Sequence, residues 1–180
     1  MGEGALFENI LFSNIIVETK IAPRQWWGRG EPIYVSVTPW HSDAPVGRMN
    51  NLRFTNILCK SECGVYIAAD HLGQISNIVL DNVRVELSHW SGSTESEEEG
   101  GWYDRRPTFK EEEQIYKPKE GIAGFHLENI EGIKMRGCEA VFADQQDYWA
   151  NAVWARGCRR LKVDVEGEAG RSGLKAIDLK

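Results

Sequence analysis

The sequence predicts an all-β fold: a right-handed single-stranded parallel β-helix of about five coils, with loop insertions. Three observations lead to this prediction. A segment with two asparagines recurs along the chain, apolar residues alternate within each copy, and helical periodicity is poor throughout. The chain has 180 residues, 42% apolar and 27% charged, which is typical of one globular domain. We therefore treat residues 1–180 as a single β-helix domain with an inserted acidic loop at about 91–120.

The repeated segment reads apolar-x-Asn-apolar, followed by x-apolar-x-Asn-apolar. It occupies residues 7–15, 49–57 and 75–83; a degraded copy begins at Leu127, with its first Asn at Asn129, and a fainter copy spans 155–165. Alternating apolar residues indicate strands with one buried face. Because Asn tolerates the left-handed backbone at bends, we expect asparagines of successive coils to stack into a ladder of side-chain hydrogen bonds.

A second strand is predicted before each copy. The candidate segments are 32–37, 64–69, 124–127, 151–155 and 173–177. Alternation predicts which side chains face the core: Ile33, Val35, Val65, Ile67, Phe125 and Leu127. The intervening side chains then point outward, in register on one face: Tyr34, Ser36, Tyr66 and His126.

Three stretches interrupt the repeat, at residues 20–30, 38–48 and 91–120. The last carries nine acidic and five basic residues, and its start reads as a solvated loop rather than a cation site. The whole chain has a net charge of -6, which argues against nucleic acid as a main partner. No run is apolar for long enough to span a bilayer, so no membrane is expected as a partner either.

The four cysteines are Cys59, Cys63, Cys138 and Cys158. The first two are spaced C-x3-C, but neither a second pair nor a histidine pair completes a zinc site. We interpret all four as buried free thiols and predict no metal. The sequence also lacks a phosphate loop, a dinucleotide fingerprint, HExxH and the G-x-S-x-G elbow, so no cofactor is predicted.

Two strings in the first part of the chain are distinctive. Residues 7–19 contain the run F-x-N-I-x-F-S-N-I-x-V-E-T, and residues 26–34 read Trp-Trp-Gly-Arg-Gly-Glu-Pro-Ile-Tyr. These strings resemble the C-terminal half of bacterial glycoside hydrolase family 28 proteins, the polygalacturonase-like pectinases. Two loops, 100–107 and 147–152, are also similar to that branch. The resemblance covers nearly the whole chain and implies a saccharide substrate or ligand.

The chain lacks the motifs that carry the catalytic chemistry of the family. The family's Asn-Thr-Asp motif, Asp-Asp pair and Gly-His-Gly motif do not occur here, and its Arg-Ile-Lys motif falls where this chain has Tyr34, Val35 and Ser36. A pectinase mechanism therefore cannot be transferred to residues of this chain.

Glycoside hydrolysis usually needs two carboxyl groups about 5 to 10 Å apart. Candidates lie beside the predicted outward face, although each also reads as a solvated loop carboxylate. The catalytic candidates are Asp70, His71, Asp104 and Glu31. The substrate-binding candidates are Trp26, Trp27, Tyr34, Tyr66, Trp102, Arg105 and His126. Indole rings stack on sugar faces, but they also pack loops onto a β-helix wall. Arg105 with Arg106 suits a sugar carboxylate, or the neighbouring glutamates.

The sequence supports two hypotheses about function. The favoured one is a carbohydrate-active enzyme of the glycoside hydrolase type, acting on a plant or microbial polysaccharide or oligosaccharide. The alternative is a non-catalytic saccharide-binding β-helix, or a truncated remnant of a pectinase-like enzyme. The resemblance implies a secreted or periplasmic protein, although no signal peptide is present in this chain. We also expect a homo-oligomer that forms through an open end of the β-helix.

Overall fold

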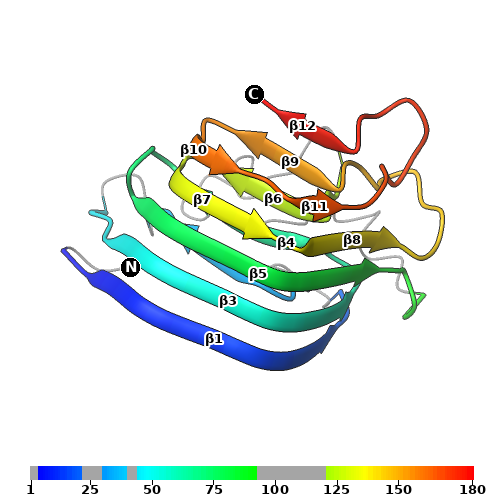
Figure 1. Ribbon diagram of the computed structural model, residues 1–180, viewed down its shortest axis with the longest axis horizontal. Coiled ribbons are helices and arrows are strands. Elements are labelled where there is room, and N and C mark those ends of the chain that lie inside the picture. Colours follow the sequence, from blue (N-terminus) through cyan, green and yellow to red (C-terminus); the bar gives the residue numbers. More distant parts are fainter. Residues whose placement is uncertain (1–3, 22–29, 40–43, 93–120) are drawn as a thin grey trace.

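The computed structural model describes residues 4–21, 30–39, 44–92 and 121–180, and in these residues it is all-β, with no helix. Its strands form two sheets whose pairings are all parallel (Figure 1). The larger sheet has the order β1 (Leu6–Thr19), β3 (Arg48–Ser61), β5 (Ile75–Leu87), β7 (Ile130–Arg136) and β10 (Arg159–Lys162). Alongside this path, β8 (Cys138–Phe142) pairs with β5 and with β11 (Val165–Glu166).

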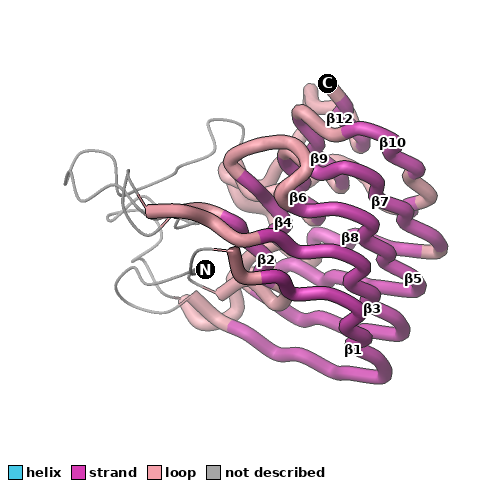
Figure 2. The backbone as a smooth tube through the Cα atoms, turned by 90° about the vertical axis from the view of Figure 1, so that its left-hand side faces the viewer, coloured by secondary structure: helices cyan, strands magenta, loops and turns pink. Residues whose placement is uncertain are grey.

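The smaller sheet has the order β12 (Ile177–Leu179), β9 (Val153–Arg156), β6 (Phe125–Glu128), β4 (Val65–Ala69) and β2 (Tyr34–Val37). The chain alternates between the two sheets, so that strands of successive visits lie one above the other (Figure 2). This arrangement confirms the all-β prediction and is compatible with a parallel β-helix. Within the described ranges there is no helix long and apolar enough to cross a membrane.

The core lies where the predicted inward side chains meet the larger sheet. All six of them are buried: Ile33, Val35, Val65, Ile67, Phe125 and Leu127. Val35, Ile67 and Leu127 are level with one another on β2, β4 and β6, so like side chains stack from strand to strand. The alternation read from the sequence is therefore confirmed in this sheet.

Glycine controls how closely the strands of the smaller sheet approach. A Cβ atom on Gly64 would lie only 1.8 Å from the carbonyl oxygen of Ala123. The backbone N–H of Val65, next along the chain, donates to the carbonyl of Gly124 at 2.9 Å. Since only glycine permits this approach, Gly64 helps to fix the register between β4 and β6.

The asparagine ladder is confirmed at both positions of the first two copies and at the second position of the third, whereas Asn77 donates to Oδ1 of Asn50 at 2.8 Å instead of to Asn51. Asn51 donates from Nδ2 to Oδ1 of Asn9 at 2.7 Å, and Asn56 donates to Asn14 at 3.2 Å. Asn82 continues the second series by donating to Asn56 at 3.0 Å. The ladder asparagines have φ between 53° and 58°, which is the left-handed region that Asn tolerates. Each ladder position therefore bends its long strand.

One expectation about the ladder was wrong. The degraded copy was aligned with Asn129 at the first Asn position, but the register places Gly132 level with Asn77. Gly132 has a φ of 85°, so glycine takes the left-handed position that Asn occupies on the preceding strands of the sheet. Asn129 instead makes the bend between β6 and β7, and it also has a positive φ of 55°.

Candidate functional site

Aromatic rings form a column on the smaller sheet, at the positions predicted to point outward. Tyr34, Tyr66, His126 and Trp154 are level on β2, β4, β6 and β9. Their ring centroids are 5.3, 4.9 and 4.2 Å apart in that order. The guanidinium of Arg156 lies 4.5 Å from the centroid of the Trp154 ring. Stacked rings and a cation over indole both stabilise such a column.

The column is buried rather than open. Tyr66 is 0% exposed, His126 is 1% and Trp154 is 5%. Because these rings are buried and stack on one another, they offer no free ring face on which a sugar could stack. The Nε1 atom of Trp154 is buried and has no hydrogen-bond partner in the part of the chain that is described.

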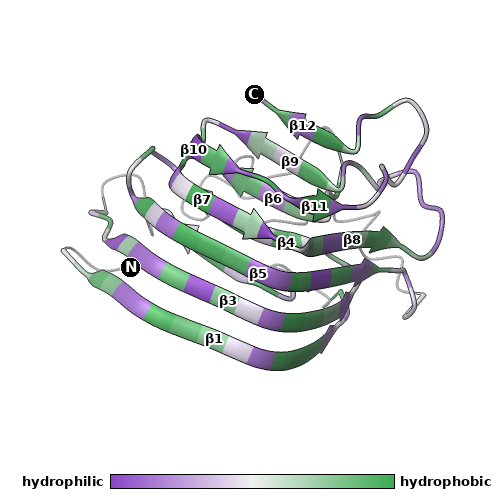
Figure 3. Ribbon diagram, viewed as in Figure 1, coloured by the Kyte–Doolittle hydropathy of each residue, from purple (hydrophilic) through white to green (hydrophobic). Residues whose placement is uncertain are grey.

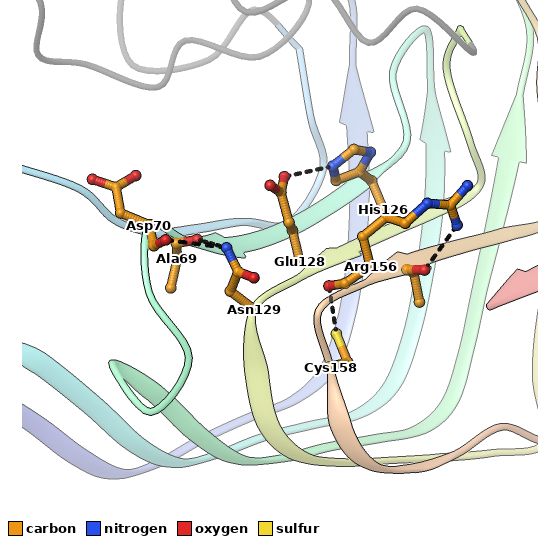
Figure 4. A network of polar contacts seen from close by, with 8 residues as sticks. Ala69, Asp70, His126, Glu128, Asn129, Arg156 and Cys158 are labelled. Atoms are coloured by element: carbon orange, nitrogen blue, oxygen red, sulfur yellow. Dashed lines mark hydrogen bonds and ion pairs between the residues drawn. The ribbon is translucent and has the colours of Figure 1, made fainter. Parts of the chain in front are cut away.

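Two carboxylates rise from the same side of this sheet as the column (Figure 4). Glu128 lies two residues beyond His126 on β6, and its Oε2 atom is 3.5 Å from His126 Nε2. The Glu128 side chain is 15% exposed. Asp70 follows the end of β4, and its carboxylate accepts hydrogen bonds from Thr38 Oγ1 at 3.2 and 3.1 Å. Both groups are therefore partly shielded from water.

The register sets the separation of the two acids. Glu128 is level with Ala68, and Asp70 lies two residues further along the neighbouring strand. Strands about 4.8 Å apart, with about 3.3 Å of rise per residue, place the two Cα atoms roughly 8 Å from each other. The two acids therefore lie on neighbouring strands and project from the same face of the sheet.

Hydrogen bonds from Asn129, which follows the neighbouring strand β6, and to Val37 of β2 hold the end of β4. Asn129 donates from Nδ2 to the carbonyl of Ala69 at 2.8 Å and to that of Asp70 at 3.2 Å (Figure 4). The N–H of Asp70 donates to the carbonyl of Val37 at 3.2 Å. These bonds fix the backbone from which the Asp70 carboxylate projects.

The structure places the other predicted residues in different ways. His71 is exposed on the turn after Asp70, where its N–H donates to Gln74 Oε1 at 2.8 Å. Glu31 lies before β2, and its Oε2 accepts the N–H of Gly30 at 3.1 Å. The remaining candidates lie outside the described residues: Trp26, Trp27, Trp102, Asp104 and Arg105. In the described ranges, no group of three His, Cys, Asp or Glu residues could hold a metal ion.

Sequence reasoning missed Glu128, Trp154 and Arg156. Each follows from the period of two along a strand: Glu128 shares a face with His126, and Arg156 shares one with Trp154. Arg156 lies level with Glu128, and its Nη2 donates to Asp178 Oδ2 at 2.9 Å. This hydrogen bond from the guanidinium lowers the pKa of the Asp178 carboxyl below its usual value. This face of the smaller sheet thus carries the Arg156 guanidinium between the carboxylates of Glu128 and Asp178.

The chain was compared with protein-family models, with curated proteins and with solved structures, and none of them matches it. The site is therefore defined by its own geometry: a buried ring column, flanked by the His126–Glu128 pair and by Asp70.

Proposed function

We propose that this protein is a carbohydrate-active parallel β-helix that hydrolyses a glycosidic bond at the outer face of its smaller sheet. The observation that carries the proposal is the His126–Glu128 pair beside Asp70 on the neighbouring strand. A pair of carboxyl groups beside the scissile bond is the usual requirement for glycoside hydrolysis. The resemblance of the sequence to family 28 glycoside hydrolases supports the same class of substrate.

The fold that we propose is a right-handed β-helix of about five coils. Five visits to each sheet, with parallel pairing throughout, support the coil number. Crossovers between parallel strands of one sheet are right-handed in about 98% of proteins, which supports the handedness. In such a solenoid, the site spans the second, third and fourth coils, and the active groups come from strands far apart in sequence.

The two acids would take different roles. Glu128, which His126 contacts, would act as the general acid that protonates the leaving oxygen. Asp70, which accepts hydrogen bonds from Thr38, would either activate a water molecule or attack the sugar. His126 is a positioning residue that orients the Glu128 carboxyl.

Amide substitutions test the assignment. Glu128→Gln and Asp70→Asn keep the shape of each side chain and remove its acid chemistry. Each is expected to lower kcat by about 10² to 10⁴-fold on nitrophenyl glycosides or pectic oligomers. Glu166→Gln, on the larger sheet, is the matched control and should keep wild-type turnover. Unchanged turnover in both site variants would contradict the assignment.

A non-catalytic saccharide-binding β-helix is the second candidate. It is favoured by the ring column, whose inner rings stack on one another and are buried, as in a structural ladder. The missing catalytic motifs of the resembled family point the same way. An absence of turnover on the whole panel, together with retardation in a polysaccharide affinity gel, would support this candidate over hydrolysis.

A further inference from the structure

A shallow groove of about 560 Å³ crosses the larger sheet, on the side opposite the core. It runs over the five adjacent strands β1, β3, β5, β7 and β10, which lie side by side in Figure 1. Three ladder asparagines line it together with four basic residues: Arg53, Lys134, Arg160 and Lys162. The chain as a whole is acidic, with a net charge of -6. The charge of this surface is therefore opposite in sign to the net charge.

Three of the four cations form a row. Arg53 is level with Val79, Val79 with Lys134, and Lys134 with Lys162. Neighbouring strands are about 4.8 Å apart, so the Cα atoms of Lys134 and Lys162 lie roughly 10 and 14 Å from that of Arg53. All three side chains are exposed. The row therefore presents positive charges along the direction in which the strands stack.

The fourth cation occupies a ladder position. Arg160 is level with Gly132, which is level with Asn77, and its φ of 52° is left-handed. Apart from Arg160, every described non-glycine residue with a positive φ is an asparagine. A left-handed backbone is unfavourable for such a residue, and backbone strain of this kind is often associated with function.

The Arg160 side chain lies over Gly132. A Cβ atom on Gly132 would lie 3.4 Å from Nη2 of Arg160 and 3.4 Å from Oδ1 of Asn77. The guanidinium thus lies over the glycine, next to the amide of Asn77. Glu131 is 3.3 Å from the same guanidinium and helps to orient it. The floor of the groove therefore carries a positioned cation among amide groups.

We propose that this groove binds a linear acidic polysaccharide lying across the strands. The row of cations matches carboxylate or sulfate groups on successive sugars. The asparagine amides, which both donate and accept hydrogen bonds, match the hydroxyl groups. Of the described side chains that line the groove, none is aromatic, whereas proteins that bind single-stranded nucleic acid use aromatic platforms for the bases. The proposal concerns a different sheet from the candidate catalytic face and does not depend on hydrolysis.

Native gel electrophoresis with polymer cast into the gel tests the proposal. We expect heparin and polygalacturonate to retard the protein and neutral dextran to leave its mobility unchanged, with the retardation decreasing as salt is raised. The variant Lys134→Gln/Lys162→Gln should weaken binding about tenfold. Arg160→Asn, which restores the common ladder residue, should weaken it too while keeping the backbone.

A charge-matched control separates the groove from net charge. Lys60→Gln/Lys175→Gln removes two exposed cations that do not line the groove, and it should bind like the wild type. Equal weakening in both double variants, no retardation by either acidic polymer, or equal retardation by dextran would each overturn the proposal. Tighter binding to single-stranded DNA than to either acidic polysaccharide would overturn it as well.

Discussion

Single asparagines bend the long strands of this protein. Asn56 has a φ of 54°, accepts a hydrogen bond from Asn82 and donates one to Asn14. An alanine at this position would keep neither the hydrogen bonds nor the tolerance of a left-handed backbone. Glycine would lose only the hydrogen bonds.

We therefore expect Asn56→Ala to lower the free energy of unfolding by about 1 to 2 kcal/mol, and Asn56→Gly by less. Urea denaturation of both variants measures the difference. Lys60→Ala, exposed on the same strand, is the control and should have little effect. An equal loss for alanine and glycine would show that backbone conformation is not the cause.

Burial changes the pKa values of the cysteine thiols. Burial of the Cys59 thiol raises its pKa from 9.0 to about 12, and burial also raises the pKa values of Cys138 and Cys158. In the folded protein these thiols keep their protons at a pH where the unfolded chain releases them. Their contribution to stability is thus complete below about pH 8.5 and is lost as the pH rises toward 12.

We expect the free energy of unfolding to fall between pH 9 and pH 11, with Cys59 contributing about 1.4 kcal/mol per pH unit. Urea midpoints at pH 7, 9 and 10 measure this slope. Cys59→Ala should flatten it, because the variant has one fewer thiol to ionise. Identical slopes in the wild type and the variant would contradict the assigned cause.

At the scale of elements, a buried carboxylate joins separate segments. Glu62, between β3 and β4, is 0% exposed. It accepts the N–H of Ile21 at 2.7 Å, and the N–H and hydroxyl of Ser91 at 2.6 and 3.0 Å. The turn after β3 thus satisfies polar groups that follow β1 and β5, which lie on either side of β3 in the sheet.

Removal of this carboxylate would leave buried donors unpaired, which costs about 1 to 3 kcal/mol for each group. We expect Glu62→Ala to lower the free energy of unfolding by about 3 kcal/mol, and Glu62→Gln, which keeps one acceptor oxygen, by less. Thermal and urea unfolding measure both. Glu86→Ala, on the half-exposed surface of β5, should change stability by about 0.5 kcal/mol or less. If Glu62→Ala left the free energy of unfolding unchanged, this would show that water replaces the carboxylate.

The strand boundaries show how much of the secondary structure the sequence pattern predicts. The predicted strands at 32–37, 64–69 and 124–127 match β2, β4 and β6 to within two residues at each end. The long strand predicted at 7–15 extends in the structure to Thr19. The copy beginning at Leu127 was displaced by three residues, because glycine replaces asparagine at the bend and hides the repeat.

In the whole molecule, β1 is an edge strand of the larger sheet among the described residues. It pairs with β3 on one side and ends the order of the larger sheet, and Leu11 and Ile16 are 61% and 76% exposed. Large apolar stretches on β1 are visible in Figure 3. An apolar hollow of about 210 Å³ lies beside it, lined by Phe12, Ile15 and Ile33 among others. Such an edge favours pairing with another chain.

We expect the 180-residue chain to self-associate through this edge, with a dimer that joins two open ends as the simplest form. Sedimentation at micromolar concentration measures the mass. Phe12→Glu places a charge at the edge and should shift the protein toward monomer, whereas Leu58→Glu, on the exposed face of β3, should not. A wild-type monomer of 20.4 kDa would contradict the expectation.

The all-β class, the inward side chains of the smaller sheet and the left-handed asparagines follow from local patterns: the period of two along a strand and the backbone preference of single residues. The tertiary structure alone brings Asp70 to the face that carries Glu128 and places Arg160 over Gly132. Those placements join strands separated by insertions of unequal length, and their register depends on packing between strands far apart in the sequence. No local pattern in the chain encodes that packing.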